Sequence, residues 1–245
     1  MNIKNIVNAG LLGLGLVSTS MAGSKMVMEH EIHQATYIQL KVNKGQETNL
    51  ADFLKKGSAL VRETEPQTKL WFALQGEDGA FGIFDVFHDD AGRATHFAGK
   101  VAAALHDNAN ALVDGGWDKG VLANVQNSII ITTNNYQTPE VLKATKASYI
   151  LLKAKEGKGE ELTALLKSGA GIINKTEPHT SFWLALKLDE NTYAIFDTFT
   201  DEVARTTHFE GAVAGALKAH ADNLIVGGWQ GVLTNVHNFN IIASS

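Results

Sequence analysis

The sequence predicts an α+β protein made of two tandem ferredoxin-like units, each with the element order β-α-β-β-α-β. A shift of 112 residues aligns the chain with itself, so that Tyr37 meets Tyr149 and the phrase Arg-x-Thr-His-Phe at 93–97 meets its copy at 205–209. In each copy, strand-like alternation and helix-like spacing follow one another in that order. Copies of about 100 residues are too long for solenoid repeats, so each copy is a small domain.

Sequence patterns in the first copy predict its strands and helices in chain order. "ATYIQLKV" alternates as a strand does, and apolar residues then recur at helical spacing. "KLWFALQ" and "AFGIFDVF" flank the turn-forming tetrad "GEDG", which predicts a hairpin. A second helix and a last strand follow. The predicted elements are a strand at 35–42, a helix through Leu50 and Leu60, hairpin strands at 69–75 and 80–87, one helix capped by Asp89 and ending near Asn108, and a strand at 121–133.

The second copy repeats this pattern, with Asp201 as the cap of its second helix, an end near His220 and a last strand at 232–243. We therefore expect domains at residues 35–133 and 147–245, joined by a polar linker at 134–146. A four-stranded ferredoxin-like sheet has one face covered by its own helices, and its bare face must be buried elsewhere. The other copy is the expected partner for that face.

The N-terminus reads as an export signal. Lys4 precedes an apolar run, and Ser20-Met21-Ala22 fits the small-x-small pattern of a cleavage site. We expect residues 1–22 to be a cleaved signal peptide, 23–34 to be a flexible segment, and the mature protein to be periplasmic or secreted without a stable membrane anchor. An uncleaved anchor is the alternative, but the run is short for a bilayer and is broken by glycines.

Composition excludes several classes of function. The formal net charge is −5 and no basic stripe occurs, which argues against nucleic acid as a partner. The chain has no cysteine, so thiolate metal sites and a cysteine nucleophile are excluded. The stretch His30-Glu31-Ile32-His33 is one residue short of the His-Glu-x-x-His zinc spacing, so we predict no specific metal site there.

"TEPQTKLWFALQGEDGAFGIFDVFHDDAGRATHFAGKVAAAL" and its second copy resemble the antibiotic biosynthesis monooxygenase family, in particular its quinol monooxygenase-like branch. The resemblance covers nearly everything from Ala35 onward. It implies a dimeric α+β barrel, here formed within one chain as an intramolecular pseudo-dimer. It further implies a pocket between each sheet and its helices, and oxidation of a small phenolic or quinol-type aromatic by O₂ with no cofactor.

Such chemistry needs a base, hydrogen-bond donors for phenolate and peroxide oxygens, and a pocket that excludes water. His96 and His208 are candidate catalytic residues, although a helical wheel with Ala94 and Phe97 facing inward puts His96 only at the flank of the buried stripe. The alternative for each is a histidine at the solvent edge. Arg93 and Arg205 are candidate substrate-binding residues; pairing with an acid on a neighbouring element is their alternative role.

Asp85 and Asp197 are candidate catalytic bases. Strand alternation places Asp85 on one face with Phe81 and Ile83, and a carboxylate within an apolar row must be paired or have a raised pKa. A salt bridge to Arg93 or Arg205, or a cap to nearby backbone, is the structural alternative.

Trp71 and Trp183 are candidate substrate-binding residues whose indole N–H groups could donate to a substrate oxygen, with core packing as the alternative. Trp117 and Trp229 follow paired glycines, where a lid or a contact between the domains is expected. Asn124 with Gln126 and Asn235 with His237 share a face of the last strand and mark where the copies have begun to differ.

Two other functions stay open beside the monooxygenase. Related folds degrade haem with a Trp and a His ten residues apart on the second helix, where this chain has His96 with His106 and His208 with Lys218. The missing tryptophan weakens that function, and so does the missing histidine in the second copy. The third hypothesis is an exported, non-enzymatic protein that uses the same pockets to bind a small apolar ligand.

Overall fold

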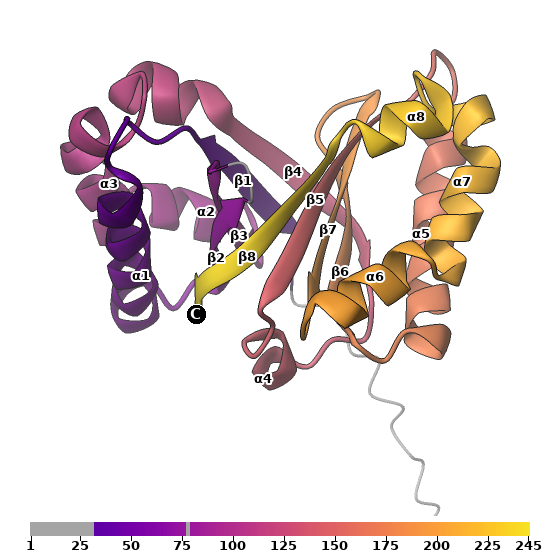
Figure 1. Cartoon of the computed structure of the whole chain (residues 1–245), viewed down its shortest axis with the longest axis horizontal. Helices are drawn as coiled ribbons and strands as arrows, with labels where there is room; N and C mark the ends of the chain where they lie inside the picture. Colours follow the sequence, from indigo (N-terminus) through magenta and orange to yellow (C-terminus); the bar gives the residue numbers. More distant parts are fainter. Residues whose placement is uncertain (1–31, 77–78) are drawn as a thin grey trace, which may run out of the picture.

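The computed structural model describes residues 32–76 and 79–245, so the predicted signal peptide and most of the predicted flexible segment lie outside it. Eight antiparallel strands close into one barrel in the order β1-β3-β2-β8-β5-β7-β6-β4. The two copies lie on opposite sides of the molecule, with the strands between them and their helices outside (Figure 1). The predicted tandem α+β barrel is confirmed.

Each half contains the predicted order of strands and helices, with additional short helices. The first half comprises β1 (Gln34–Leu40), α1 (Glu47–Thr64), β2 (Thr68–Gly76), β3 (Phe81–Phe87), α2 (Asp90–Phe97), α3 (Lys100–Leu112), the π-helix η1 (Gly116–Val121), the 3₁₀ turn η2 (Leu122–Asn124) and β4 (Val125–Thr133). A short helix, α4 (Thr138–Val141), lies between the halves. The second half comprises β5 (Lys146–Lys153), α5 (Gly159–Thr176), β6 (Thr180–Lys187), β7 (Thr192–Phe199), α6 (Glu202–Phe209), α7 (Ala212–Leu224), α8 (Gly228–Leu233) and β8 (Val236–Ser244).

The last strand of each half joins the two sheets. β4 pairs with β1 of its own half and with β6 of the other, and β8 pairs with β5 and with β2. In Figure 1, β8 runs from α8 across the molecule to end near α1. There the Ser58 hydroxyl donates to the backbone oxygen of Ser244, at 2.9 Å. Because β4 and β8 each pair with strands of both halves, the barrel has no free sheet edge.

The barrel interior is built from the bare faces of both sheets, as expected. Its buried cluster takes aromatic residues from both halves. The rings of Phe84 and Phe196 stack with their centroids 3.6 Å apart, and those of Tyr37 and Tyr149 stack at 4.1 Å. These contacts cross the pseudo-twofold axis, so neither half could expose this face without losing a large apolar area.

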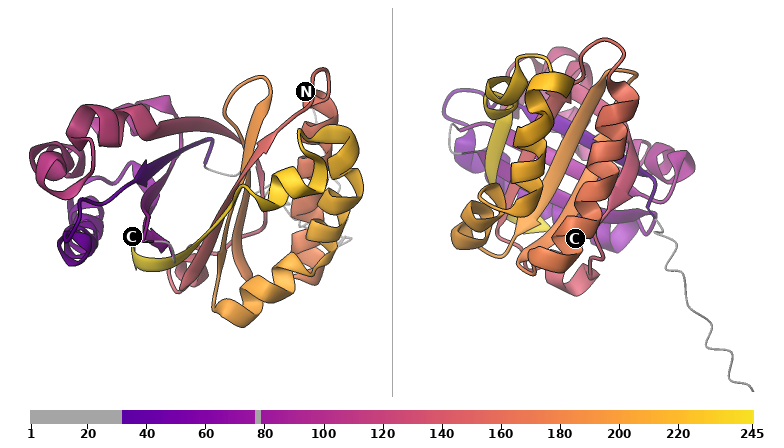
Figure 2. Two further views of the ribbon diagram at one scale, coloured as in Figure 1. Left: turned by 45° about the horizontal axis from the view of Figure 1, so that its top comes forward. Right: turned by 90° about the vertical axis from the view of Figure 1, so that its right-hand side faces the viewer.

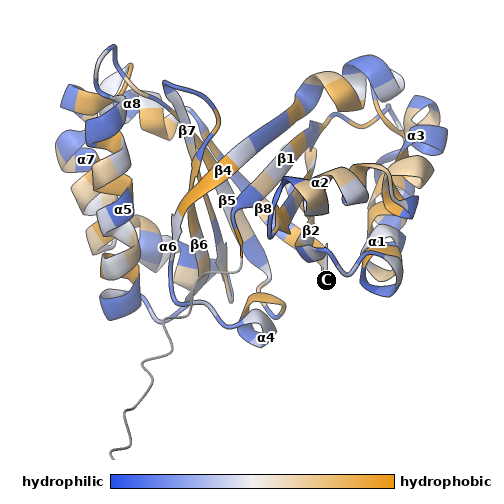
Figure 3. Ribbon diagram, turned by 180° about the vertical axis from the view of Figure 1, so that it is seen from behind, coloured by the Kyte–Doolittle hydropathy of each residue, from blue (hydrophilic) through white to orange (hydrophobic). Residues whose placement is uncertain are grey.

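Two further cores lie between each sheet and its own helices. The turned views show α5 and α7 side by side across the outer face of the second half (Figure 2). Hydrophilic residues colour much of the outward surface of these helices, whereas apolar residues gather toward the strands (Figure 3). The chemistry-bearing residues described below lie in these two outer cores and outside the barrel interior.

The predicted single second helix is wrong in both halves. It is broken into α2 and α3, and into α6 and α7, at the extended backbone of Gly99 and Gly211. A Cβ on Gly99 would lie 2.5 Å from the Glu65 carboxylate, so the glycine at this position leaves room for that side chain. The break also shifts the helical phase: Ala94 is exposed, contrary to the predicted stripe, and His96 is buried.

The last strands begin later than predicted, at Val125 and Val236, because a short helical segment precedes each. The first copy has one residue more than the second in this segment, and its turn is a π-helix where the second copy has an α-helix. A π-turn is the usual way in which a helix absorbs one inserted residue. Within the described residues, no helix is both long enough and apolar enough to span a bilayer.

Candidate active site

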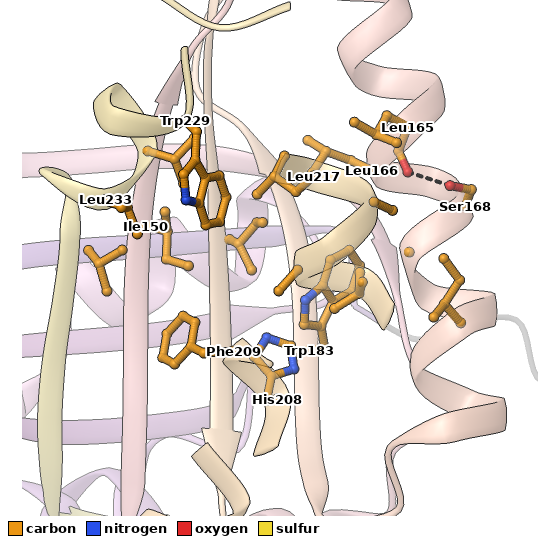
Figure 4. Close-up of a pocket in the computed structure, with 18 residues that line it drawn as sticks. Ile150, Leu165, Leu166, Ser168, Trp183, His208, Phe209, Leu217, Trp229 and Leu233 are labelled. Atoms are coloured by element: carbon orange, nitrogen blue, oxygen red, sulfur yellow. Dashed lines mark hydrogen bonds between the residues drawn. The ribbon is translucent and has the colours of Figure 1, made fainter. Parts of the chain in front are cut away.

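Each half contains a mainly apolar pocket between its sheet and its outer helices. The first is lined by Trp71, Asp85, His96, Phe97 and Trp117 together with aliphatic residues, and encloses about 480 Å³ including its open mouth. The second is lined by Trp183, His208, Phe209 and Trp229 with aliphatic residues, and encloses about 600 Å³ on the same measure. Figure 4 shows the second pocket with His208 and Trp183 at one end and Trp229 at the other. The mainly apolar lining suits an apolar ligand that also occupies the open mouth.

A histidine between two carboxylates lies at the polar end of the first pocket. His96, on α2, is 5% exposed. Its Nδ1 lies 2.6 Å from Glu65 Oε2 and 3.1 Å from the Thr68 hydroxyl. Its Nε2 lies 3.3 Å from Asp85 Oδ2, on β3. His96 is therefore a buried residue and does not lie at the solvent edge.

The second half repeats this cluster. His208 Nδ1 lies 2.5 Å from Glu177 Oε2, and Nε2 lies 3.2 Å from Asp197 Oδ2. Both carboxyl groups and the imidazole are buried. Thr180 differs slightly from Thr68, because its hydroxyl contacts the Glu177 carboxylate rather than the histidine, at 3.2 Å. The duplicated cluster therefore has the same charge composition in both halves.

The histidines are cationic at neutral pH. Burial by itself lowers the pKa of His96, but the Asp85 and Glu65 carboxylates outweigh it and raise the pKa to about 10. His208 is subject to the same opposing effects of burial and of Asp197 and Glu177, and its pKa rises to about 9. Both ring nitrogens are then protonated and act as donors.

Asp85 and Asp197 are fully buried, and burial raises the pKa of each carboxyl, although the neighbouring histidine opposes the rise. The contact with histidine has the separation of an ion pair, but no oxygen of either aspartate has a partner in hydrogen-bonding geometry within the described residues. A buried carboxylate with unused acceptor capacity is costly in a purely structural role. The predicted bridges from Asp85 to Arg93 and from Asp197 to Arg205 are wrong, since histidine takes that place.

Glu65 and Glu177 are site residues that the sequence analysis did not single out. Glu65 follows α1, and its Oε1 also accepts from the backbone N–H of Val101 in the first turn of α3, at 3.1 Å. Although burial raises its pKa, these hydrogen bonds from His96 and Val101 dominate and lower it. The signal was present in the exact recurrence of Thr-Glu-Pro, 31 residues before each histidine, but only the broken helix shows why the glutamate reaches inward.

Trp71 and Trp183 line the pockets and are 1% exposed. Each is seated against a glycine of the covering helix: a Cβ on Gly57 would lie 3.5 Å from the Trp71 ring, and one on Gly169 would lie 3.0 Å from the Trp183 ring. The indole N–H of Trp183 is buried with no hydrogen-bond partner in the described part of the chain. In Figure 4 this nitrogen lies on the side of the ring that faces His208.

Arg93 and Arg205 do not line either pocket. Arg93 pairs with Asp90, and Arg205 pairs with Glu202, each three residues earlier on its own helix rather than on a neighbouring element. Arg205 also donates to the backbone oxygen of Phe239 in β8, at 3.4 Å. This structure therefore places both arginines in contacts with protein groups.

Trp117 and Trp229 line the mouths of the pockets, beside two exposed leucines, Leu122 and Leu233. They therefore lie at a pocket rather than between the domains. Paired glycines with positive φ precede each tryptophan, at Gly115–Gly116 and Gly227–Gly228, and allow the tight turn that places it there.

His106 and Lys218, which lie ten residues after His96 and His208, each pack on the tryptophan at the mouth of their pocket. The His106 ring meets Trp117 edge-on at 5.0 Å, and the Lys218 ammonium lies 6.0 Å from the Trp229 ring centroid. Both side chains lie at the outer rim, away from His96 and His208.

The polar residues of the last strands have separate structural contacts. Asn124 and Asn235 lie just before these strands rather than on them, and they donate to backbone oxygens of the preceding turn. Gln126 accepts from the Tyr149 hydroxyl, at 2.9 Å, and His237 lies opposite Tyr149 in the strand register. In the described residues, no group of three or more histidine and carboxylate side chains is arranged so that it could hold a metal ion; His30 and Glu31 of the N-terminal histidine stretch lie outside that range.

Neither a protein-family model nor a curated protein matches this chain. Several solved structures, however, are similar to it. A "putative monooxygenase" of Fusobacterium nucleatum aligns with a TM-score of 0.72 at 13% identity, covering 87% of this chain and 94% of its own. One of Lactobacillus acidophilus aligns with a TM-score of 0.68 at 12% identity, covering 87% and 95%. An "anthrone oxidase-like protein" aligns at 0.55 with 10% identity, covering 87% and 92%. Together with the closed eight-stranded barrel, these likenesses show that the chain has the same tandem α+β barrel fold as these solved structures.

Proposed function

We propose that this chain is an exported monooxygenase that oxidises a small phenolic or quinol-type aromatic with O₂ and without a cofactor. The observation that carries the proposal is the polar end of the first pocket, where the His96 imidazolium and the Asp85 carboxyl, with its raised pKa, meet an otherwise apolar cavity. The names of the structural neighbours support a monooxygenase, and the predicted signal peptide supports export.

The cluster divides the roles between its members. A histidine that is already protonated cannot accept a second proton, so His96 acts as a donor and a fixed positive charge. Asp85 is the base, because it lines the pocket and neither carboxylate oxygen has a hydrogen-bonding partner in the described residues. Glu65 is a positioning residue that holds the imidazolium. We assign the same roles to His208, Asp197 and Glu177 in the second half, where His208 lines the pocket and Asp197 lies 3.2 Å from its Nε2.

A balanced reaction follows from these roles. Asp85 takes a proton from the aromatic substrate, and the anion is stabilised by His96. The anion passes one electron to O₂, and the substrate radical combines with the resulting superoxide to form a peroxide after protonation. Where the reacting carbon is an activated CH₂, loss of water from the peroxide leaves a ketone. One oxygen atom of O₂ is then in the product and the other is in water.

Oxygen uptake by purified residues 23–245 tests the proposal, with hydroquinones and anthrone as substrates. Asp85→Asn and Asp197→Asn remove the proposed base from one pocket each, and Asp107→Asn makes the same chemical change at an exposed site. We expect uptake above the autoxidation rate, a fall of about 10²-fold or more in the double variant, and no change in Asp107→Asn. A single variant that loses most of the activity identifies the working half.

Absence of uptake above autoxidation for every substrate would overturn the oxygenase. Binding of the same aromatics without turnover would then favour the ligand-binding protein, which needs only the apolar pockets. A Soret band on adding haem would instead favour haem binding.

A further inference from the structure

We propose that the two pockets of this chain take aromatic ligands of different size, and that residues Phe53 and Leu165 set the difference. The first pocket accepts a one-ring phenol, and the second also accepts a fused three-ring phenol. This inference deepens the proposed function by assigning a size class to each pocket, and it takes from that function only the expectation of a phenolic ligand.

The two linings match position by position. Every first-pocket residue that has an equivalent in the second lining is identical to it, with one exception. The identical pairs include Trp71 with Trp183, His96 with His208, Leu105 with Leu217 and Trp117 with Trp229. The exception is Phe53 of α1, which corresponds to Leu165 of α5. A duplicated pocket has thus kept its chemistry and changed a single side chain in the lining that both copies share.

The change alters the space in the expected direction. Counted together with the open mouth, the pocket that carries Phe53 offers about 480 Å³ and the one that carries Leu165 about 600 Å³. A phenyl ring fills space that the smaller isobutyl group of leucine leaves open. Both residues are half-buried one helical turn before the glycine that seats the pocket tryptophan, so neither is a fully enclosed core residue.

The additional space extends along α5. Ser168 and Ile172 line the second pocket, whereas their equivalents, Lys56 and Leu60, do not line the first. Positions 165, 168 and 172 follow one face of the helix, since residues three, four and seven apart lie above one another. Figure 4 shows Leu165 and Ser168 together at this side of the pocket, away from Trp229 and His208. The Ser168 hydroxyl is satisfied by the Leu165 carbonyl, at 2.6 Å, so this extension offers a mainly apolar wall.

The geometry also orients the ligand. At one end the Trp183 indole N–H is an unpartnered donor in the described residues and His208 carries a positive charge, whereas the extension past Leu165 is apolar. A fused-ring phenol fits with its oxygen toward His208 and its distal ring along α5. In the first pocket, the Phe53 ring occupies the place of that distal ring.

Binding stoichiometry tests this inference without turnover. The purified chain is titrated under nitrogen with 4-methylphenol and with 9-phenanthrol, using equilibrium dialysis for stoichiometry and tryptophan fluorescence for affinity. We expect two 4-methylphenol sites and one 9-phenanthrol site in the wild type. Phe53→Leu should add a second 9-phenanthrol site. Leu165→Phe should weaken binding of 9-phenanthrol at the existing site at least about 10-fold, because one methylene group too many in an apolar pocket already has an effect of that size.

Retained binding of two 4-methylphenol molecules shows that each variant is folded with open pockets. An unchanged 9-phenanthrol stoichiometry in both variants overturns the inference, as does failure of the wild type to bind either probe. If the two variants change 9-phenanthrol binding as expected but no substrate gives oxygen uptake, the size assignment is upheld and the oxygenase is refuted. The two proposals therefore fail separately.

Discussion

Raising the pH from 6.5 to 9 is expected to destabilise the fold through the two buried histidines. His96 and His208 each lie between two carboxylates, and the pKa values in the folded protein are raised from 6.5 to about 10 and about 9. A group whose pKa is higher in the folded state contributes stability below its unfolded pKa and loses it as the pH rises through the folded pKa. The raised pKa of Asp85 and of Asp197 has the same sign, so it does not offset the fall.

The magnitude follows from the shifts. One pKa unit is worth about 1.4 kcal/mol, so full deprotonation is linked to a loss on the order of 5 kcal/mol for His96 and 3 kcal/mol for His208. Between pH 7 and 8, where both stay protonated only in the folded state, the free energy of unfolding should fall by roughly 2 to 3 kcal/mol. That is a large part of the 5 to 15 kcal/mol typical of a native protein.

Urea denaturation at half-unit steps from pH 6 to 9 measures this slope. His96→Gln and His208→Gln should each remove about half of it, and the double variant should be nearly flat. His88→Gln and His106→Gln are the matched controls, because these histidines are about half exposed, each beside a single aspartate. A flat wild-type profile, or a double variant that keeps the wild-type slope, would refute the assignment of the buried histidines as cations.

Three further variants test packing, helix propensity and capping. Gly169→Ala places a Cβ 3.0 Å from the Trp183 ring, so we expect a loss of about 1 to 3 kcal/mol in thermal or urea unfolding and a shifted tryptophan emission. Gly171→Ala on the same helix meets nothing within 4 Å and should stabilise by about 0.5 to 1 kcal/mol; destabilisation there would contradict the helix-propensity argument. Asp201→Ala removes the cap on the Ala204 N–H, at 2.8 Å, and should cost about 1 kcal/mol by urea unfolding, whereas no change would show that water replaces the cap.

Much of the fold could be predicted because its signals are local and occur twice. Alternation predicted the strands, the turn tetrad predicted the first hairpin, and Asp89 and Asp201 were recognised as caps, as their contacts with the Gly92 and Ala204 N–H groups confirm. The second helix was misjudged because its residues have helical spacing on both sides of the break. The break itself depends on Glu65, more than thirty residues away.

The candidate site was likewise predictable only where its signals are local. Asp85 in an apolar strand and the repeated histidine were visible as unusual residues, and the choice of partners was not. Charge alone favoured Arg93 as the partner of Asp85, but Arg93 pairs with Asp90 of its own helix and His96 contacts Asp85 instead.

The sequence by itself determined the duplication, the order of elements and the apolar faces, because these follow from composition and from periods of 2 and 3.6 residues. Only the tertiary structure decided that the last strand of each half also pairs with the sheet of the other half, and that Glu65 and Glu177 complete the histidine clusters. It also decided which single side chain differs between the two shared pocket linings. The physical reason is that strand partners, buried ion pairs and cavity walls are set by contacts between residues far apart in the chain, which no local pattern records.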